Sequence, residues 1–466
     1  MDATISITKK SNITIWEVEK MKRKVLSVLL AAAMVVSMTA CGSSAGTATK
    51  DASSDGEAAT TITEAEGEAV TIRVFSNLPD RTTGQGFVEQ TLFDNYMAEN
   101  SNVKIEVETL DDEAYKTKFK AYASGSDMPD LVNAWGQPSF LNEIIDAGLL
   151  AELNMDDYSD YGFISGSLDG FSKNGKLYGL ARNTDVMGFY YNKAIFEKNG
   201  WKVPATYDEL MELAGKIKET GMIPCSMDGS DKWPLSIYIN DLMQKIDPES
   251  KSLLQPSIAN GDFSSPIYKE ACELFVKAVD AGMFQSGFET TDYGTSKNLF
   301  TNGQAAMFYM GSWEMSMASD ETISQDVKDN IGVFMMPVVD GGKGNATDIA
   351  AWNGGGYAVT ANSAVKEEAI KLLNYMFLPE NWSKICWENG VCMSAQDYSA
   401  YLTGNETSVQ LDFTDIVSGA TSVTGVTFND LESSEFKTIS EDLSQELAIK
   451  AVTVDEFTKR LEEACK

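Results

Sequence analysis

Short strand-like runs alternate with helix-like stretches along most of this chain, and this alternation limits the folds open to it. Val70–Phe75, Val103–Val107 and Asp130–Ala134 are rich in apolar and β-branched residues, as strands are. Phe87–Asn100 instead repeats its apolar residues close to the 3.6-residue period of a helix. The pattern predicts α/β units with parallel sheets. Because ligands of such sheets bind beyond the carboxyl ends of the strands, the loop after Phe75 is a candidate binding loop.

Further helices are expected in the second half of the chain. Thr206 is the expected N-cap of a helix, with Glu209 three residues later, a pattern typical of a helix start. Pro266 to Ala281 predicts another helix, and 438–465 predicts two more. At 466 residues the chain is too long for one ordinary core, so two domains are expected.

The N-terminal region has the features of an export signal. A basic run begins at Met21, the apolar stretch Val25–Val36 follows, and small residues precede Cys41. This order is similar to that of bacterial lipoproteins, in which the cysteine is lipidated. We therefore expect residues 1–40 to be a leader whose true start is Met21, and 41–69 to be a flexible acidic linker. The mature protein would then be anchored by its lipid to the outer face of the cell membrane.

Charge and composition exclude several classes of function. The net charge of −32 argues against nucleic acid as a partner, and the absence of histidine removes Ser-His-Asp and Cys-His catalysis and His-ligated metals. We expect no catalytic residues, cofactor or metal, and a monomer. Five cysteines follow Cys41 without the spacing of a disulfide framework. Whether Cys386 and Cys392 pair is left open.

Four segments, in order along the chain, resemble the family 1 extracellular solute-binding proteins, relatives of the maltose-binding protein that serve ABC importers. The second of them reads YNKAIFEKNGWKVPATYDEL, which is highly characteristic of that family. The four segments are Ser124–Val132, Lys176–Leu210, Phe300–Trp313, and Gly354–Val359 with the following Lys366–Phe377.

The resemblance implies a two-lobed α/β fold of the periplasmic-binding-protein kind (type II), each lobe a sheet flanked by helices, with the ligand in the cleft between lobes. It places lobe I at 70–184 and 334–390 and lobe II at 185–333 and 391–466. It also implies a carbohydrate ligand, delivered to the transmembrane subunits of an ABC permease by lobe closure.

Candidate ligand-binding residues are aromatic rings in loops, which stack on sugar faces, and polar side chains that bind hydroxyls. Trp313 matches the position at which the family stacks a ring on sugar. Arg182 and Asn183 lie near the expected first crossing between lobes. The expected ligand-binding set is Trp313, Trp352, Asn353, Trp233, Asp228, Trp135, Asn77, Asp80, Arg81, Asp130, Asp185 and Glu314.

Other functions remain open at this point. The same fold could bind a polyamine or a glycerophosphodiester. A secreted carbohydrate-active enzyme working through two carboxyl groups is the less favoured alternative. The sugar, its length and its linkage do not follow from the residues.

Overall fold

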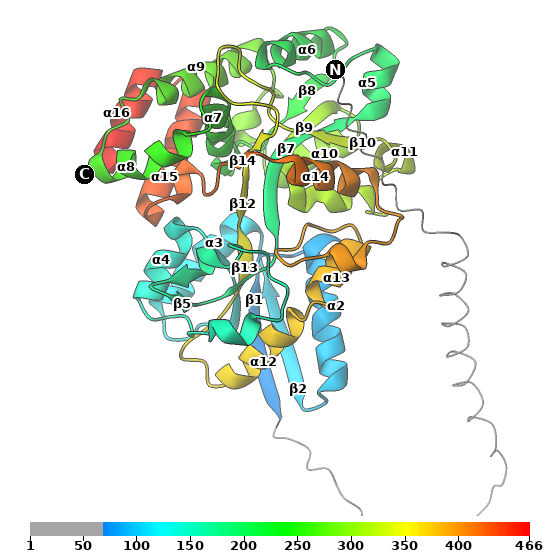
Figure 1. The fold of residues 1–466 in the computed structure, drawn as a ribbon, viewed down its shortest axis with the longest axis vertical. Helices are drawn as coiled ribbons and strands as arrows, with labels where there is room; N and C mark the ends of the chain where they lie inside the picture. The colour runs from blue at the N-terminus through cyan, green and yellow to red at the C-terminus, as the bar shows by residue number, and fades with distance from the viewer. Residues whose placement is uncertain (1–68) are drawn as a thin grey trace, which may run out of the picture. The chain divides into compact units, whose positions relative to one another are not determined.

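The computed structural model describes residues 69–466, which form two α/β lobes built on two main sheets (Figure 1). The predicted α/β class and two-sheet architecture are confirmed. The predicted leader, its lipidation site Cys41 and nearly all of the predicted linker lie outside the described residues.

Lobe I is built on a five-stranded sheet of order β2-β1-β3-β13-β6. Its first three strands are parallel, and β13 runs antiparallel to β3. The parallel expectation therefore holds for only part of the sheet. The reason is geometric: the chain returns from the other lobe beside Trp135, at the carboxyl end of β3, and must run back along it. The strands are β1 (Val70–Ser76), β2 (Val103–Thr109), β3 (Leu131–Trp135), β6 (Leu180–Ala181) and β13 (Gly355–Val359).

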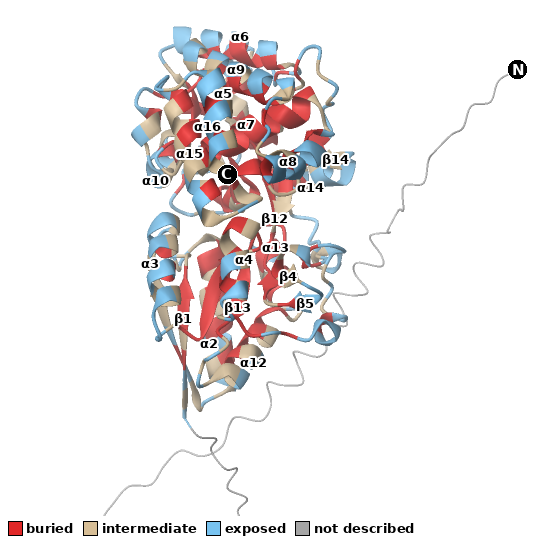
Figure 2. Ribbon diagram, turned by 90° about the vertical axis from the view of Figure 1, so that its left-hand side faces the viewer, coloured by how far each residue is buried: buried red, intermediate tan, exposed pale blue. Residues whose placement is uncertain are grey.

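Helices cover both faces of this sheet (Figure 2); β3 and β13 are almost entirely buried beneath them, whereas the edge strand β2 is largely accessible. Their apolar residues join those of the strands in one core that includes Phe93, Phe119 and Trp382. The helices are α2 (Gly84–Glu99), α3 (Asp112–Ser124), α4 (Pro138–Asp146), α12 (Lys366–Met376) and α13 (Trp382–Glu388).

Lobe II is built on a sheet of order β10-β7-β9-β8, and β12 pairs with the start of β7. Only β8 and β9 are parallel. The strands are β7 (Thr184–Asn192), β8 (Ile223–Ser226), β9 (Ala305–Gly311), β10 (Ile331–Phe334) and β12 (Ala351–Asn353). The helices are α5 (Lys193–Asn199), α6 (Tyr207–Glu219), α7 (Trp233–Ile246), α8 (Ser250–Asn260), α9 (Pro266–Ala281), α10 (Tyr293–Thr301), α11 (Gln325–Lys328), α14 (Ser408–Gly419), α15 (Ser434–Ala448) and α16 (Val454–Ala464).

Short elements complete the fold. They are η1 (Met155–Tyr158), η2 (Asp169–Phe171), η3 (Phe288–Thr290), η4 (Ser312–Ala318), η5 (Ser399–Tyr401), η6 (Phe428–Asp430), β4 (Ser172–Lys173), β5 (Lys176–Leu177), β11 (Asp348–Ile349) and β14 (Ser422–Val423).

Local sequence signals located several helices well. The hydroxyl of Thr206 accepts a hydrogen bond from the Glu209 backbone N–H at 3.2 Å, so the predicted cap of α6 is present. The Glu209 carboxylate reaches the backbone N–H of Ala205 rather than that of the cap itself. Helix α9 has the predicted bounds, and the predicted C-terminal pair corresponds to α15 and α16.

Three crossings join the lobes, and they lie side by side. At the first two, Asp185 of β7 pairs with Trp352 of β12. At the third, the Thr184 backbone N–H donates to the Met393 carbonyl at 2.9 Å. The second crossing falls at Asn353–Gly355, whereas the sequence placed that boundary near residue 334. The intervening segment stays with lobe II because Met336, Val339 and Ala350 pack into its core.

No disulfide is present among the described residues. Four of the five cysteines there are buried, and the Sγ atoms of Cys386 and Cys392 lie 3.6 Å apart as a thiol–thiol contact. None of the described helices combines the length and apolar character needed to cross a bilayer.

Candidate functional site

A cleft of about 800 Å³ is lined by residues of both lobes. Lobe I contributes the loop that begins at Asn77, after β1, and the N-termini of α2, α3 and α4. Lobe II contributes η4 and the N-termini of α7, α10 and α15. The cleft therefore lies beyond the carboxyl ends of β1 and β3, where the predicted α/β sheet places a ligand.

Three half-buried tryptophans from separate segments meet on the lobe II wall. The ring centroids of Trp233 and Trp313 lie 5.8 Å apart, and those of Trp313 and Trp352 lie 6.5 Å apart. Trp313 Nε1 donates to the Tyr293 hydroxyl at 2.7 Å, which fixes the ring's orientation. A Cβ on Gly311 would collide with the Trp313 ring, so this position requires glycine. Together the three rings form an aromatic wall.

The fourth predicted ring, Trp135, lines the cleft from lobe I in a different setting. The ammonium of Lys116 lies 5.2 Å from its ring centroid. Tyr115 and Phe140 meet the ring edge-on, at centroid distances of 5.6 and 5.0 Å. In this conformation its stacking contacts are with the protein itself.

Polar side chains at the first crossing form the floor of the cleft. Arg182 donates to the side-chain oxygens of Asn77 and Asn183, both at 3.2 Å, and Asn183 donates to the carboxylate of Asp185. Burial raises the pKa of Asp185 to about 7, and the nearby charge of Arg182 opposes this rise. The carboxyl of Asp185 is thus partly protonated at neutral pH.

A second polar group lies beside the aromatic wall. The Glu314 carboxylate forms an ion pair with Lys297 at 2.8 Å and accepts a hydrogen bond from the Tyr293 hydroxyl at 2.5 Å. Burial disfavours the charge on Asp80, which lines the lobe I side, but hydrogen bonds from Thr82 outweigh it and lower the pKa of Asp80.

The far end of the cleft holds a charged network from both lobes. On lobe I, Lys116 forms ion pairs with Asp112 and Glu113 at 2.8 and 2.7 Å. On lobe II, Lys437 forms ion pairs with Asp430 and Glu441 at 2.9 and 2.5 Å.

The structure brings eight of the twelve predicted side chains to the cleft. They are Trp313, Trp352, Trp233, Trp135, Asn77, Asp80, Asp185 and Glu314. The other four, Asn353, Asp228, Arg81 and Asp130, do not line it.

Arg81 and Asn353 are adjacent to cleft segments but are held by other partners. Arg81 forms an ion pair with Glu89 of α2. Asn353 accepts from the Thr184 hydroxyl at 3.1 Å and donates to the carbonyl of Gly166 at 3.4 Å.

Asp130 and Asp228 have structural roles. Asp130 precedes β3 and so lies at the amino end of the sheet, where it accepts from the Arg73 backbone N–H and the Ser363 hydroxyl at 2.8 and 2.6 Å. Asp228 is completely buried and accepts from the Asp231 backbone N–H at 3.1 Å. Burial and the neighbouring charge of Asp231 raise its pKa to about 8.

Several residues that line the cleft were not predicted from the sequence. Gln85 and Gln137 are 7% exposed, and each has an Oε1 atom without a hydrogen-bond donor among the described residues. Both stand at helix N-termini that follow strands, a signal that could have identified them. The other unselected charged or hydrogen-bonding side chains are Thr83, Asp111, Asp112, Glu113, Lys116, Thr117, Lys120, Ser139, Arg182, Asn183, Asp231, Asp292, Tyr293, Lys297, Ser316, Asp430, Ser434, Lys437, Thr438 and Glu441.

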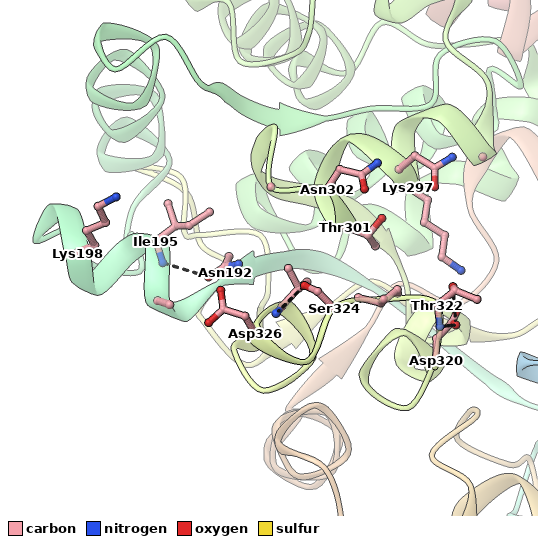
Figure 3. A pocket seen from close by; sticks show the side chains of 16 residues that line it. Asn192, Ile195, Lys198, Lys297, Thr301, Asn302, Asp320, Thr322, Ser324 and Asp326 are labelled. Carbon is pink, nitrogen blue, oxygen red and sulfur yellow. Dashed lines mark hydrogen bonds between the residues drawn. The ribbon is translucent and has the colours of Figure 1, made fainter.

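A second cavity, of about 790 Å³, opens on lobe II between α5, α10 and the segment leading into α11 (Figure 3). Figure 3 shows Asn192 and Asp326 at one end and Lys297 and Asp320 at the other. Its lining contains no aromatic ring. No group of acidic or sulfur side chains in the described part of the chain is arranged to hold a metal ion. The cleft is therefore the candidate ligand site.

Comparisons with known proteins agree with this geometry. Residues 91–387 match the family model described as bacterial extracellular solute-binding protein. A multiple sugar-binding protein of Streptococcus mutans is 27% identical over 285 residues, which are 60% of this chain and 65% of that protein's length.

Two solved structures share the fold over most of the chain. One comes from work on xylan utilisation by Caldanaerobius polysaccharolyticus and has a TM-score of 0.77 at 25% identity, covering 84% of this chain and 99% of that one. The other is a chitin oligosaccharide binding protein with a TM-score of 0.76 at 22% identity, covering 86% and 98%.

Proposed function

Because this chain belongs to the bacterial extracellular solute-binding protein family, we propose that it captures a sugar or oligosaccharide for an ABC importer. Membership makes it a binding protein rather than an enzyme, as the sequence predicted. Beyond family membership, we propose the carbohydrate ligand and the ABC permease partner.

The aromatic wall of Trp233, Trp313 and Trp352 is the observation that carries the proposal. Sugars present apolar C–H faces that pack on indole rings and a rim of hydroxyls that hydrogen-bond to amides and carboxylates. The three neighbouring rings with Asn77 and Arg182 nearby supply both kinds of contact. The volume of about 800 Å³ lies within the range of about 300–1,000 Å³ typical of small-molecule sites. The name of the Streptococcus mutans relative supports the same class of ligand.

Lobe closure would couple capture to delivery. A ligand held between walls from two lobes stabilises the conformation in which both walls touch it. The lobes are joined beside the cleft by polar contacts that could strengthen that conformation: the Ser139 hydroxyl donates to Asp430 at 2.5 Å, and the Ser434 hydroxyl donates to Glu143 at 3.1 Å. The closed, ligand-bound conformation is the form that a permease can recognise.

We also propose that the protein is tethered outside the cell membrane through a lipidated Cys41. The basic run, apolar stretch and small residues before this cysteine support the tether. Metabolic labelling with a palmitate analogue tests it. The wild-type protein should take up label and sediment with membranes, whereas Cys41→Ala should remain unlabelled; equal labelling of the two would refute the tether.

A thermal-shift screen of the mature protein with mono- and oligosaccharides tests the ligand class. A sugar at 100 times its Kd adds about 2.7 kcal/mol to the free energy of unfolding, which is readily measured as a rise in Tm. Calorimetry then gives the Kd of each hit. A shift with spermidine or a glycerophosphodiester, and none with any sugar, would overturn the proposal.

A further inference from the structure

We propose that the cleft accepts uncharged glycans and rejects acidic ones, and that Asp231 and Asp292 on the lobe II wall set this selectivity. This inference rests on the proposed function and adds to it the charge of the ligand. Carboxylate-, sulfate- and phosphate-bearing sugars are the excluded class.

Carboxylates outnumber cations in the cleft by ten to five. The carboxylates are Asp80, Asp111, Asp112, Glu113, Asp185, Asp231, Asp292, Glu314, Asp430 and Glu441, and the basic residues are Lys116, Lys120, Arg182, Lys297 and Lys437.

The basic residues of the cleft either already bind other side chains of the protein or lie at the surface. Lys116, Lys297 and Lys437 each form an ion pair with a carboxylate of the cleft. Arg182 is bonded to Asn77 and Asn183, and Lys120 is exposed. An acidic ligand would therefore have to compete with the protein's own carboxylates for the three paired lysines and with amide oxygens for Arg182.

Half of the carboxylates in the cleft have no basic side chain within ion-pair distance among the described residues. No ion pair is present in the described part of the chain for Asp80, Asp111, Asp185, Asp231 or Asp292. The Asp292 carboxylate accepts from the Thr295 backbone N–H at 2.7 Å, and this bond lowers the pKa of Asp292. Its negative charge, like that of Asp80, is thus retained at neutral pH.

Asp231 stands where negative side chains of both lobes converge. It directly precedes the stretch that carries Trp233, and its neighbours include Asp228 on its own lobe and Asp112 and Glu113 on the opposite wall. Burial, aided by the charges of Glu113 and Asp112, raises the pKa of Asp231, although a hydrogen bond with Asp228 and the charge of Lys116 offset part of the rise. A ligand anion placed here would add another like charge.

The unpaired amides of lobe I point to the same class of ligand. The Oε1 atoms of Gln85 and Gln137 are buried acceptors without a donor among the described residues. A sugar hydroxyl can donate to such an oxygen, whereas an ionised carboxylate, sulfate or phosphate group carries only acceptors. These two oxygens can therefore bind a hydroxyl donor but not an anion.

Enclosure of the ligand between the lobes strengthens the selection of neutral over acidic sugars. An ion that leaves water for a closed cleft loses its hydration, and like charges a few ångströms away repel it more strongly than they would in water. Specificity of this kind comes from building unfavourable contacts against the wrong ligand.

The experiment compares three forms of one glycan. The best neutral oligosaccharide from the thermal-shift screen is oxidised at a terminal C6 to the uronate, and part of the uronate is converted to the uronamide, which has nearly the same shape but no charge. Calorimetry on the mature protein at pH 7.5 measures all three. We expect the uronamide to bind within a few-fold of the parent and the uronate to bind at least tenfold more weakly than the uronamide.

Variants test the assigned residues. In Asp231→Asn/Asp292→Asn the uronate-to-uronamide ratio of Kd should fall at least threefold. Asn is as good an N-cap as Asp, so α10 should be preserved. Asp415→Asn, an exposed change on α14 away from the cleft lining, should leave the ratio unchanged. Raising the salt concentration should also reduce the ratio, because salt screens charge repulsion.

The outcomes separate this inference from the proposed function. Equal affinity of uronate and uronamide, or an unchanged ratio in the double variant, overturns the inference while sugar binding stands. Failure of every neutral glycan, parent included, overturns the proposed function itself.

Discussion

The three indole rings of the aromatic wall do not have equal roles. Trp313 lies between the other two and, within residues 69–466, is the only one of the three whose Nε1 donates a hydrogen bond, to Tyr293 at 2.7 Å. The Nε1 of Trp233 has no partner among the described residues. Trp313 is therefore the oriented centre of the wall, and its neighbours extend the surface on either side.

Replacing Trp313 with alanine should weaken sugar binding by about 30-fold, because a central aromatic contact typically contributes about 2 kcal/mol. Calorimetry of the variant measures the loss. Trp201→Ala is the matched control: that ring is also half-buried in lobe II but packs on Phe196, at a centroid distance of 5.8 Å, and does not line the cleft. Full affinity in Trp313→Ala would remove it from the site.

Asp185 should give the protein a stability that falls as pH rises. Its pKa is about 7, raised chiefly by burial from the ordinary 3.8. Between these values the unfolded chain loses the proton while the folded chain keeps it, so this group favours unfolding progressively from about pH 4 to 7. Below and above that window its contribution is constant.

In Asp185→Asn, this contribution is absent. The Tm of the variant minus that of the wild type should therefore increase from pH 4 to pH 7 and then level off, as measured by calorimetric scans at each pH. Asp415→Asn should show no such trend. A flat difference for Asp185→Asn would show that the carboxyl ionises at its ordinary pH in the folded protein.

At the scale of elements, the paired crossings determine how the floor of the cleft is built. β12 and β7 run antiparallel through the interlobe region, so Trp352 lies opposite Asp185 in register. Gly354 follows directly, and a Cβ there would collide with the Asp185 carboxylate and approach the Trp352 indole nitrogen. Close packing of the two crossings therefore requires glycine.

Gly354→Ala should lower the free energy of unfolding by about 1–3 kcal/mol, the usual cost of overpacking, and weaken ligand binding. Chemical denaturation and calorimetry measure the two effects. Gly215→Ala serves as control, since its Cβ would enter open space on α6 and alanine favours the helix. If Gly354→Ala matches the wild type in both respects, the crossings have room to adjust.

Sequence alone predicts those features that depend on neighbouring residues. The cap at Thr206 and the bounds of α9 follow from contiguous signals, and the loop after β1 was correctly expected at a cleft. The antiparallel β13 was not foreseen, since it depends on where a distant crossing enters the sheet. Lys116 and Lys437 likewise enter the site from helices far apart in the chain, and no local pattern brings them together.

For the molecule as a whole, the polar contacts between α4 and the η6–α15 region should favour the conformation in which the lobes are together. Removing both serines, in Ser139→Ala/Ser434→Ala, eliminates hydrogen bonds that each contribute about 0.5–1.5 kcal/mol. The Kd for sugar should rise several-fold, and small-angle scattering should give a larger radius of gyration.

Ser124→Ala is the control, because that hydroxyl bonds within α3, to the carbonyl of Lys120. An unchanged Kd and radius in the double variant would show that these contacts do not influence closure.

The position of β13 has a consequence for how the chain acquires its fold during export. The strand lies between β3 and β6 in the lobe I sheet, although about 170 residues separate it from β6 and the whole β7–β10 sheet lies in that interval. A chain that leaves the membrane N-terminus first has to present all four of those strands before the lobe I sheet can be completed. Contacts this distant in sequence form slowly. Lobe II in turn depends on α15 and α16, whose Phe436, Leu443 and Phe457 pack into its core and follow β13 in the chain. Both lobes should therefore become resistant to protease only late in export, lobe I before lobe II.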